Sequence, residues 1–178
     1  MTIVRDGARR VAVRDDEPSA VVTTRHWTRR ELAGVAGPAR ETRAVVEVLR
    51  ALGGMRMRAL LGATFVPDPA STVTVVEVPE GEPLGWGSPT TCVSELGTPL
   101  VPGLPSDFTG AVADGLVTAA GATPLPPGTL RVDRAAHDEV DSSEMAFTLA
   151  AGLLHTVFTA LTNDRDHLAA AGTAADAW

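Results

Sequence analysis

The spacing of hydrophobic residues in the second half of the chain predicts two amphipathic helices. In the first, Pro105–Ala120, proline suits the opening turn and the apolar residues share one face. In the second, Ser142–Leu161, apolar residues recur at steps of four, which gives a stripe wide enough to lie on a sheet. Asp141 and Glu144 have the spacing of a helix start, where side-chain oxygens accept free amide hydrogens. The stripe, which we interpret as core rather than a groove, consists of Met145, Leu149, Leu153, Val157 and Leu161.

Runs rich in valine and threonine predict strands around these helices. Ser71–Pro79 is the longest such run, and Thr129–Asp133 is a shorter one. Arg56 and Arg58 alternate with apolar neighbours, which predicts a further strand that enters the second half of the chain. We therefore expect an α+β unit with a sheet of about four strands and both helices on one face.

The beginning of the chain predicts a hairpin followed by helices. Arg9–Arg14 and Ala20–Thr24 have the composition of short strands, and the residues between them favour a turn. Thr28 and Glu31 have the spacing of a capping box, which predicts a short helix to about residue 36. A second helix is expected over Pro38–Leu52, ended by the glycine pair that follows.

Composition sets the size of the core and the expected division of the chain. With 178 residues, 44% of them hydrophobic, the chain can bury one substantial core. No change in composition marks a flexible linker. We expect an Arg-rich extension over residues 1–56 that packs on a main domain over residues 57–165. Residues 166–178 form an Ala/Gly-rich tail, which we expect to be poorly ordered unless Trp178 docks.

Several kinds of chemistry are not supported by the residues present. All 15 basic residues are arginine, and a chain without lysine cannot form the phosphate-binding loop that nucleotide hydrolysis of the P-loop type requires. We expect no nucleotide, no cofactor and no catalytic role. His155 and His167 lack neighbours at metal-ligand spacing, so no metal site is expected. The single cysteine, Cys92, is expected to pack as a small apolar residue rather than to act as a nucleophile.

Neither a signal peptide nor a membrane-spanning segment is expected. Arginine and aspartate interrupt the first ten residues, and no uninterrupted apolar run reaches the roughly 18 residues that span a bilayer. We interpret the chain as soluble and cytoplasmic.

Charge is divided unevenly between the two parts of the chain. Up to Arg58 there are 12 arginines and 7 acidic residues, whereas beyond it there are 3 and 15. Because phosphate contacts need positive side chains, any contact with RNA should come from the first part or from a local loop. The candidate cluster is Arg25, Trp27, Arg29 and Arg30. Arginine could hold phosphate while tryptophan stacks on a base; we favour a simpler interpretation, in which tryptophan packs and the arginines stay solvated.

Two separated strings resemble domain IV of translation elongation factor G. Val140–Phe147 reads VDSSEMAF, and Leu104–Leu116 places proline, an acidic residue, an aromatic and Ala-Val at the family's spacing. Ser71–Pro79, the Gly/Pro-rich Pro83–Ser88 and Thr129–Asp133 occur in the matching order. The resemblance implies a left-handed β-α-β crossover and a domain that enters the decoding site of the ribosome, here without the GTPase domain.

The resemblance also implies a binding loop at the tip of this domain. In the family, a loop before the matched helix carries a histidine that approaches RNA, and it corresponds here to Arg134, His137, Asp138 and Glu139. The loop departs from the family because it has one residue more between the histidine and Val140 and is acidic. The family's second tip loop, rich in Gly, Arg and Gln, is not found here; its nearest candidate is Gly53–Arg56. Without this loop the contact surface for the decoding site is incomplete.

Two functions follow as hypotheses. The first is a non-catalytic factor that docks on the ribosome, ribosomal RNA or a translation GTPase. The second is a binding or scaffold protein that uses the fold for a small-molecule or protein ligand.

Overall fold

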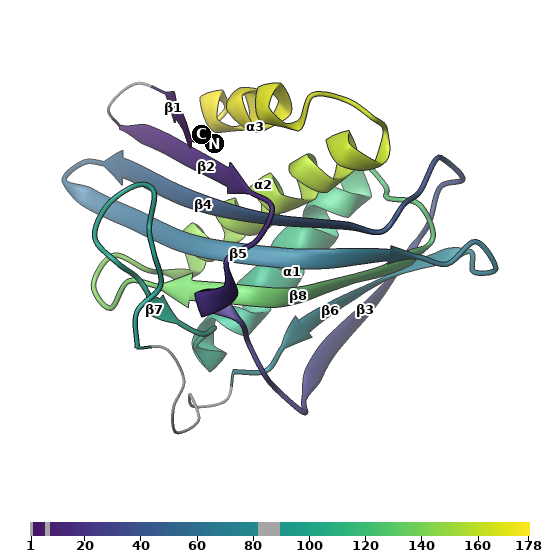
Figure 1. Ribbon diagram of the computed structural model, residues 1–178, viewed down its shortest axis with the longest axis horizontal. Coiled ribbons are helices and arrows are strands. Elements are labelled where there is room, and N and C mark those ends of the chain that lie inside the picture. The colour runs from purple at the N-terminus through teal and green to yellow at the C-terminus, as the bar shows by residue number, and fades with distance from the viewer. Residues whose placement is uncertain (1, 6–7, 82–89) are drawn as a thin grey trace.

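One mixed sheet organises the protein. The computed structural model describes residues 2–5, 8–81 and 90–178. Seven strands follow the order β1-β2-β4-β5-β8-β6-β3, and a short strand, β7, pairs with the end of β8 (Figure 1). The strands are β1 Thr2–Arg5, β2 Arg9–Arg14, β3 Trp27–Ala33, β4 Thr42–Leu52, β5 Met55–Pro67, β6 Val73–Pro79, β7 Val101–Pro102 and β8 Gly128–His137.

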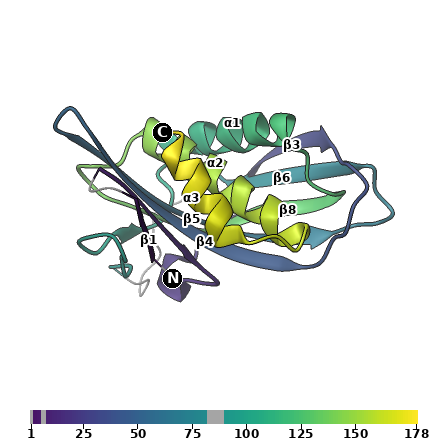
Figure 2. The same ribbon diagram turned by 90° about the horizontal axis from the view of Figure 1, so that it is seen from above.

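Three helices cover one face of this sheet. They are α1 Ser106–Ala122, α2 Glu144–Thr162 and α3 His167–Asp176, and Figure 2 shows them in a layer on one side of the strands. The apolar side chains of β5 and β8 on this face pack with the buried side of α2, and Phe65, Leu130, Phe147, Leu154 and Phe158 are fully buried. The two helices predicted from hydrophobic spacing are thus confirmed. The side-chain cap of α2 is Ser143, not Asp141, because the Ser143 side chain accepts from the Ala146 amide.

The sheet is larger than the four strands expected, because two predicted helices are strands. Residues 27–33 form β3, which pairs antiparallel with β6. The spacing of Thr28 and Glu31 imitates a capping box, but pairing along the whole length of β6 outweighs this local preference. The short helix expected to residue 36 is therefore wrong.

The helix expected over Pro38–Leu52 is also wrong, since residues 42–52 form β4. All six residues from Ala44 to Leu49 are buried, as in a strand that is covered on both faces and so shows no alternation. Gly53 and Gly54 have φ of 59° and 86° and form the hairpin turn between β4 and β5 instead of ending a helix.

Two other expectations for the ends of the chain change. β2 forms as predicted, but Ala20–Thr24 is not its partner strand; Pro18–Ala20 is a 3-10 turn, η1, and β2 pairs with β1 and β4. The tail forms α3, capped by the side chain of Asp166, and Trp178 packs against the core. Strands from residues 1–56 and 57–165 pair directly, so the sheet is continuous across residue 56.

Strand β6, helix α1 and strand β8 form a β-α-β unit. β6 and β8 are adjacent and parallel, with Thr74 opposite Gly128. It is the only parallel pair among the strands described. The left-handed crossover implied by the resemblance stays a prediction, and the Pro83–Ser88 stretch lies outside the described residues.

The second face of the sheet, which we call the outer face, is covered by chain segments without regular structure. Cys92 and Leu100 bridge to each other and pack, with Ala20, on Val45 and Leu60. In Figure 1 these segments lie in front of β4 and β5. Cys92 is buried in this cluster, and burial raises the pKa of its thiol. It therefore packs as an apolar residue, as predicted.

Helix α2 has 19 residues and is long and apolar enough to cross a membrane, but 61% of its apolar window is buried inside the protein. A core helix of a soluble protein has the same properties. The position of α2 between the sheet and its neighbouring helices is consistent with such a protein.

Candidate functional site

Two turns meet at one end of the sheet and form what we call the tip. The first is the β4–β5 hairpin turn, and the second is the loop from Asp138 to Ser143 that connects β8 to α2; both lie at the left in Figure 1. The Arg58 amide donates to the Asp141 carbonyl at 2.9 Å. The Ser142 hydroxyl donates to the Arg58 carbonyl at 2.6 Å. These bonds fix the loop against the hairpin.

A groove of about 580 Å³ runs between the two turns. Four apolar side chains around it are exposed: Leu52 by 53%, Met55 by 67%, Val140 by 87% and Met145 by 56%. Exposed apolar side chains that are grouped in one place are typical of a binding surface, whereas single ones are common anywhere. The groove is therefore the strongest candidate for a binding site at the tip.

The polar residues of the groove carry both signs of charge. Arg50 and Arg56 line it together with Asp141, Ser142 and Ser143. Arg56 is exposed, and Arg50 is half-buried. The arginines can donate hydrogen bonds to carboxylates, phosphates or backbone carbonyls of a partner.

The predicted tip-loop residues lie in different environments. His137 is the last residue of β8, opposite Ala59 and Val101, with Nδ1 3.4 Å from the Gly103 carbonyl oxygen. It is thus not in the loop. Arg134 lies within β8 and is buried. Asp138 and Glu139 are in the loop, but only Glu139 is exposed.

Asp138 is part of a buried polar network, called here the Arg58 network. Its carboxylate accepts from Arg58 at 2.7 Å, and Arg58 also donates to the Ser94 hydroxyl and the Thr98 carbonyl. Glu47 lies 3.6 Å from the same guanidinium. Arg58 is 3% exposed and Glu47 0%, so each charge depends on its partners.

Hydrogen bonding lowers the pKa of Asp138. Burial acts in the opposite direction, but the amides of Asp141 and Val140 donate to the carboxylate, and the Arg58 guanidinium is close by. The net result is a pKa below the ordinary value. The carboxylate is consequently a fixed anion that holds the loop to β5 rather than a free ligand for RNA.

A second network occupies the outer face around Arg134. A bulge in β8 at Asp133 interrupts the register with β5. Arg134 donates to Asp16 at 3.0 Å, and Arg43 contacts both Asp16 and Asp133. Burial acts to raise the pKa of Asp16, but the hydrogen bond from the Glu17 amide and the charges of these arginines lower that pKa below its ordinary value. A Cβ at Gly62 would lie 2.8 Å from that of Arg134, so this glycine makes room for the arginine.

The predicted RNA-contact cluster is divided by the pleat of β3. Trp27 and Arg29 lie on the outer face, where Arg29 pairs with Glu77 at 2.7 Å and the Arg131 guanidinium lies 5.1 Å from the centre of the Trp27 ring. Arg30 alternates to the other face, and Arg25 precedes the strand, exposed. Trp27 therefore stacks on an arginine of its own chain, and the four residues do not form one surface.

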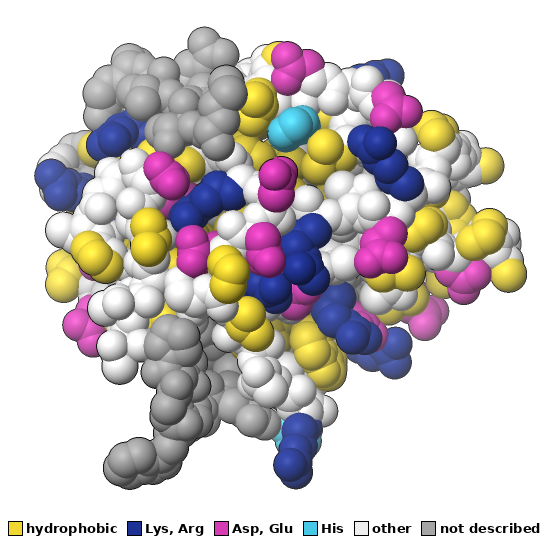
Figure 3. Space-filling model, viewed as in Figure 1, with side chains coloured by type: hydrophobic (Ala, Val, Ile, Leu, Met, Phe, Trp, Pro, Cys, Tyr) yellow, Lys and Arg dark blue, Asp and Glu magenta, His cyan; other side chains and the backbone are white. Residues whose placement is uncertain are grey.

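Charges of both signs are mixed across the outer face. Figure 3 shows basic and acidic side chains next to each other over its middle. Within the described part of the chain, no three His, Cys, Asp or Glu side chains gather in a way that could hold a metal ion. The face consequently resembles a set of paired charges rather than a positive patch for nucleic acid.

The sequence indicates only part of the groove. Gly53–Arg56, the nearest candidate for the family's second tip loop, supplies residues that line it, whereas hydrophobic spacing places Leu52 in a helix and Met145 in the core stripe. The signal available was the Gly-Gly pair, which is typical of a hairpin turn and leaves its flanking residues exposed. Neither protein-family models nor curated protein sequences match this chain.

Proposed function

We propose that this chain is a non-catalytic docking protein that binds a macromolecular partner through the tip. One observation carries the proposal: the hairpin turn and the pre-helix loop meet and leave four apolar side chains exposed around one groove. The pre-helix loop is anchored to β5 by hydrogen bonds with Arg58, close to the hairpin turn. A surface held in this way binds without first being ordered, which lowers the entropic cost of association.

The partner that we propose is the ribosome, in the cytoplasm. The resemblance to domain IV of elongation factor G implies two loops at the tip, and Gly53–Arg56 lies beside the loop before α2, where a second tip loop would be needed. Arg50 and Arg56 would contact phosphate or protein carboxylate. The apolar side chains would pack against ribosomal protein or exposed bases.

A second candidate is a scaffold that binds a protein ligand. Methionine, leucine and arginine are grouped at the groove without an exposed aromatic ring. Interfaces between proteins are enriched in methionine and arginine, whereas single-stranded RNA is usually bound by aromatic stacking. This composition supports a protein surface as the partner, on the ribosome or elsewhere.

Sedimentation with purified ribosomes at low salt tests the first candidate. We expect the unmodified protein to pellet with ribosomes. Val140→Asp should reduce pelleting, because Val140 is the most exposed apolar residue of the tip. Val35→Asp is the matched control, since Val35 is exposed on a different loop and does not line the groove.

Salt dependence then separates the contributions to binding. If arginine contacts phosphate, pelleting should decrease as salt rises. Arg56→Ala should then reduce the slope of the logarithm of the binding constant against the logarithm of salt concentration by about one. Arg25→Ala serves as the control for loss of charge. If the unmodified protein does not pellet at low salt, the ribosome is not its partner, and the scaffold function takes its place.

A further inference from the structure

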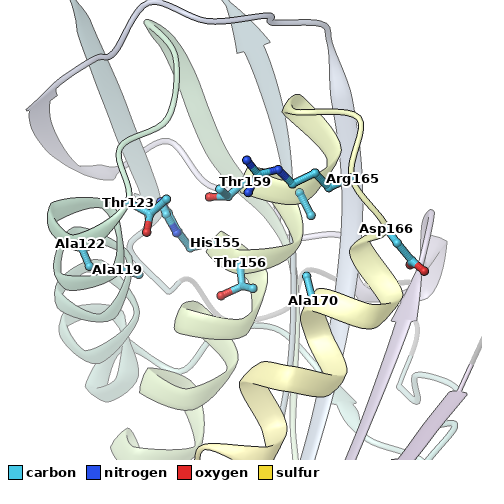
Figure 4. Close-up of a pocket in the computed structure, with 10 residues that line it drawn as sticks. Ala119, Ala122, Thr123, His155, Thr156, Thr159, Arg165, Asp166 and Ala170 are labelled. Atoms are coloured by element: carbon cyan, nitrogen blue, oxygen red, sulfur yellow. The ribbon is translucent and has the colours of Figure 1, made fainter.

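A cavity of about 400 Å³ lies on the helix side of the protein, far along α2 from the tip. It is open to solvent on one side and is bordered by the end of α1, the second half of α2 and the beginning of α3 (Figure 4). Its size falls in the range of small-molecule pockets, which begins at roughly 300 Å³. Alanine side chains from all three helices form much of its wall.

Two polar atoms on α2 beside this cavity have no partner. His155 Nε2 and Thr159 Oγ1 are buried and form no hydrogen bond. His155 is only 2% exposed, and in Figure 4 its ring extends from α2 toward Thr123 at the end of α1. Buried polar groups are nearly always paired in proteins, so these two atoms are unused partners for a water or for a polar group of a ligand beside the cavity.

The protonation of His155 defines what that group can be. Burial lowers the pKa of His155 to about 4, so the imidazole is neutral at physiological pH. A neutral imidazole can donate from one nitrogen and accept at the other. It can therefore bind a polar group of a ligand, but it does not supply a positive charge.

Arg165 supplies the positive charge at the cavity. In Figure 4 its side chain extends across the end of α2 toward Thr159. Arg165 is exposed, and no hydrogen bond or ion pair of its guanidinium is found among residues 8–81 and 90–178. Asp166 is also at the margin, but its carboxylate accepts from the Leu168 and Ala169 amides. The guanidinium is thus available to an anion.

We propose that this cavity binds a small organic carboxylate. Arg165 pairs with the carboxylate group, the alanine walls enclose an apolar body, and His155 with Thr159 hydrogen bonds to a polar substituent of the ligand. A single arginine matches a monoanion, and the nearby Asp166 carboxylate disfavours a dianion such as a phosphate monoester. The site is separate from the tip and does not depend on its function.

Titration followed by NMR tests this site with benzoate as the probe and benzamide as its neutral isostere. In the protein labelled with ¹⁵N, we expect saturable shifts of the His155 ring nitrogens and of the Thr123 and Ala170 amides on adding benzoate. Benzamide should bind at least about tenfold more weakly, because it lacks the charge that Arg165 recognises.

Two variants identify the residues involved. Arg165→Gln should weaken benzoate binding by about tenfold, whereas Arg25→Gln, which removes an exposed arginine elsewhere, should leave it unchanged. Ala170→Leu should fill the cavity and abolish the shifts without altering the exposed surface of the sheet. Equal binding of benzoate and benzamide would overturn the proposal, and so would shifts confined to other residues. The same holds if no saturable shift appears at a benzoate concentration 50-fold above a roughly millimolar dissociation constant.

Discussion

The two faces of the sheet are buried in different ways. On the helix face, the three helices cover apolar side chains of β2, β4, β5, β8 and β6. On the outer face, segments without regular structure cover a mixture of small apolar residues and paired charges. The buried charged groups of the outer face are Glu17, Glu47, Arg58, Glu77 and Arg134, whereas His155 is the buried ionisable side chain described on the helix side.

This difference shows how a sheet can be covered on both faces without a second layer of helices. A helix presents a wide apolar stripe and needs an apolar surface beneath it. Irregular segments instead expose backbone carbonyls and hydroxyls, such as Thr98 and Ser94, which can satisfy a buried arginine. The helix face should therefore dominate stability, and the outer face should hold the tip loop in place.

The largest effect is expected on the helix face. Phe147 is fully buried and stacks on Phe108, with ring centroids 4.9 Å apart. Phe147→Ala should lower the free energy of unfolding by about 3–5 kcal/mol, because it leaves a cavity in the core. Urea denaturation measures this. Leu149→Ala, on the half-buried side of the same helix, should cost less; an equal loss would show that α2 is not packed as described.

The Arg58 network provides the corresponding test of the outer face. Arg58→Met should destabilise by roughly 3 kcal/mol, since Glu47 and Asp138 then remain without their cation. Adding Glu47→Leu should recover part of the loss by removing the buried carboxylate. Urea denaturation of the single and double variants measures the coupling. If the double variant loses as much free energy of unfolding as the two single variants together, the two charges do not stabilise each other.

Mild acid should act on the helix side. The pKa of His155 is lowered to about 4 from 6.5 because the ring is buried. The unfolded chain therefore binds the proton first, and stability falls as pH decreases from 6.5 toward 4, by up to about 3 kcal/mol. His155→Leu should remove this part of the pH dependence. His26→Gln, which removes an exposed imidazole, should retain it.

Stronger acid should act on the outer face. The pKa of Asp138 is lowered by the Asp141 and Val140 amides and by Arg58, against the effect of burial. Its stabilisation is complete above the ordinary value of 3.8 and is lost as pH falls through the lower folded value. Asp138→Asn should cost roughly 1–3 kcal/mol at pH 7. Its stability curve should meet that of the unmodified protein near the acid limit; a constant difference would rule out titration of this group.

The smallest effect is expected at the exposed margin of the outer face. Arg29 is exposed and pairs with Glu77, which also has Arg131 at 2.6 Å. Arg29→Ala should cost less than about 1 kcal/mol, because surface pairs are weak and the second arginine remains. Thermal denaturation of this variant beside Arg131→Ala checks it. A loss of more than about 2 kcal/mol would place Arg29 among the buried network residues.

The helices of the C-terminal part could be predicted because the sequence signals for them lie within a few residues of each other. The steps of four in α2 and the proline at the start of α1 act within a few residues. In β4 the same test was misleading, because Val45, Val48 and Leu49 fit helical spacing by chance while neighbouring positions are also apolar. A strand that is buried on both faces has no alternation to detect.

The candidate sites depend on contacts between distant residues. Glu47 meets Arg58 only after β4 and β5 pair in register, and Asp133 meets Arg43 through the bulge in β8. The groove at the tip likewise requires Leu52 to end a strand instead of a helix. Predicting these contacts would have required the pairing of the strands, which a single sequence does not provide.

The position of β8 has a consequence for how this chain folds during its synthesis. β5 and β6 are consecutive in sequence, but β8 lies between them in the sheet. Until residue 137 has left the ribosomal exit tunnel, the facing edges of β5 and β6 have no partner, and unpaired edges promote aggregation. The last strand to be made is therefore the one that joins the two parts of the sheet. Because these pairings span long stretches of chain, we expect folding to be slow compared with that of a helical bundle of similar size.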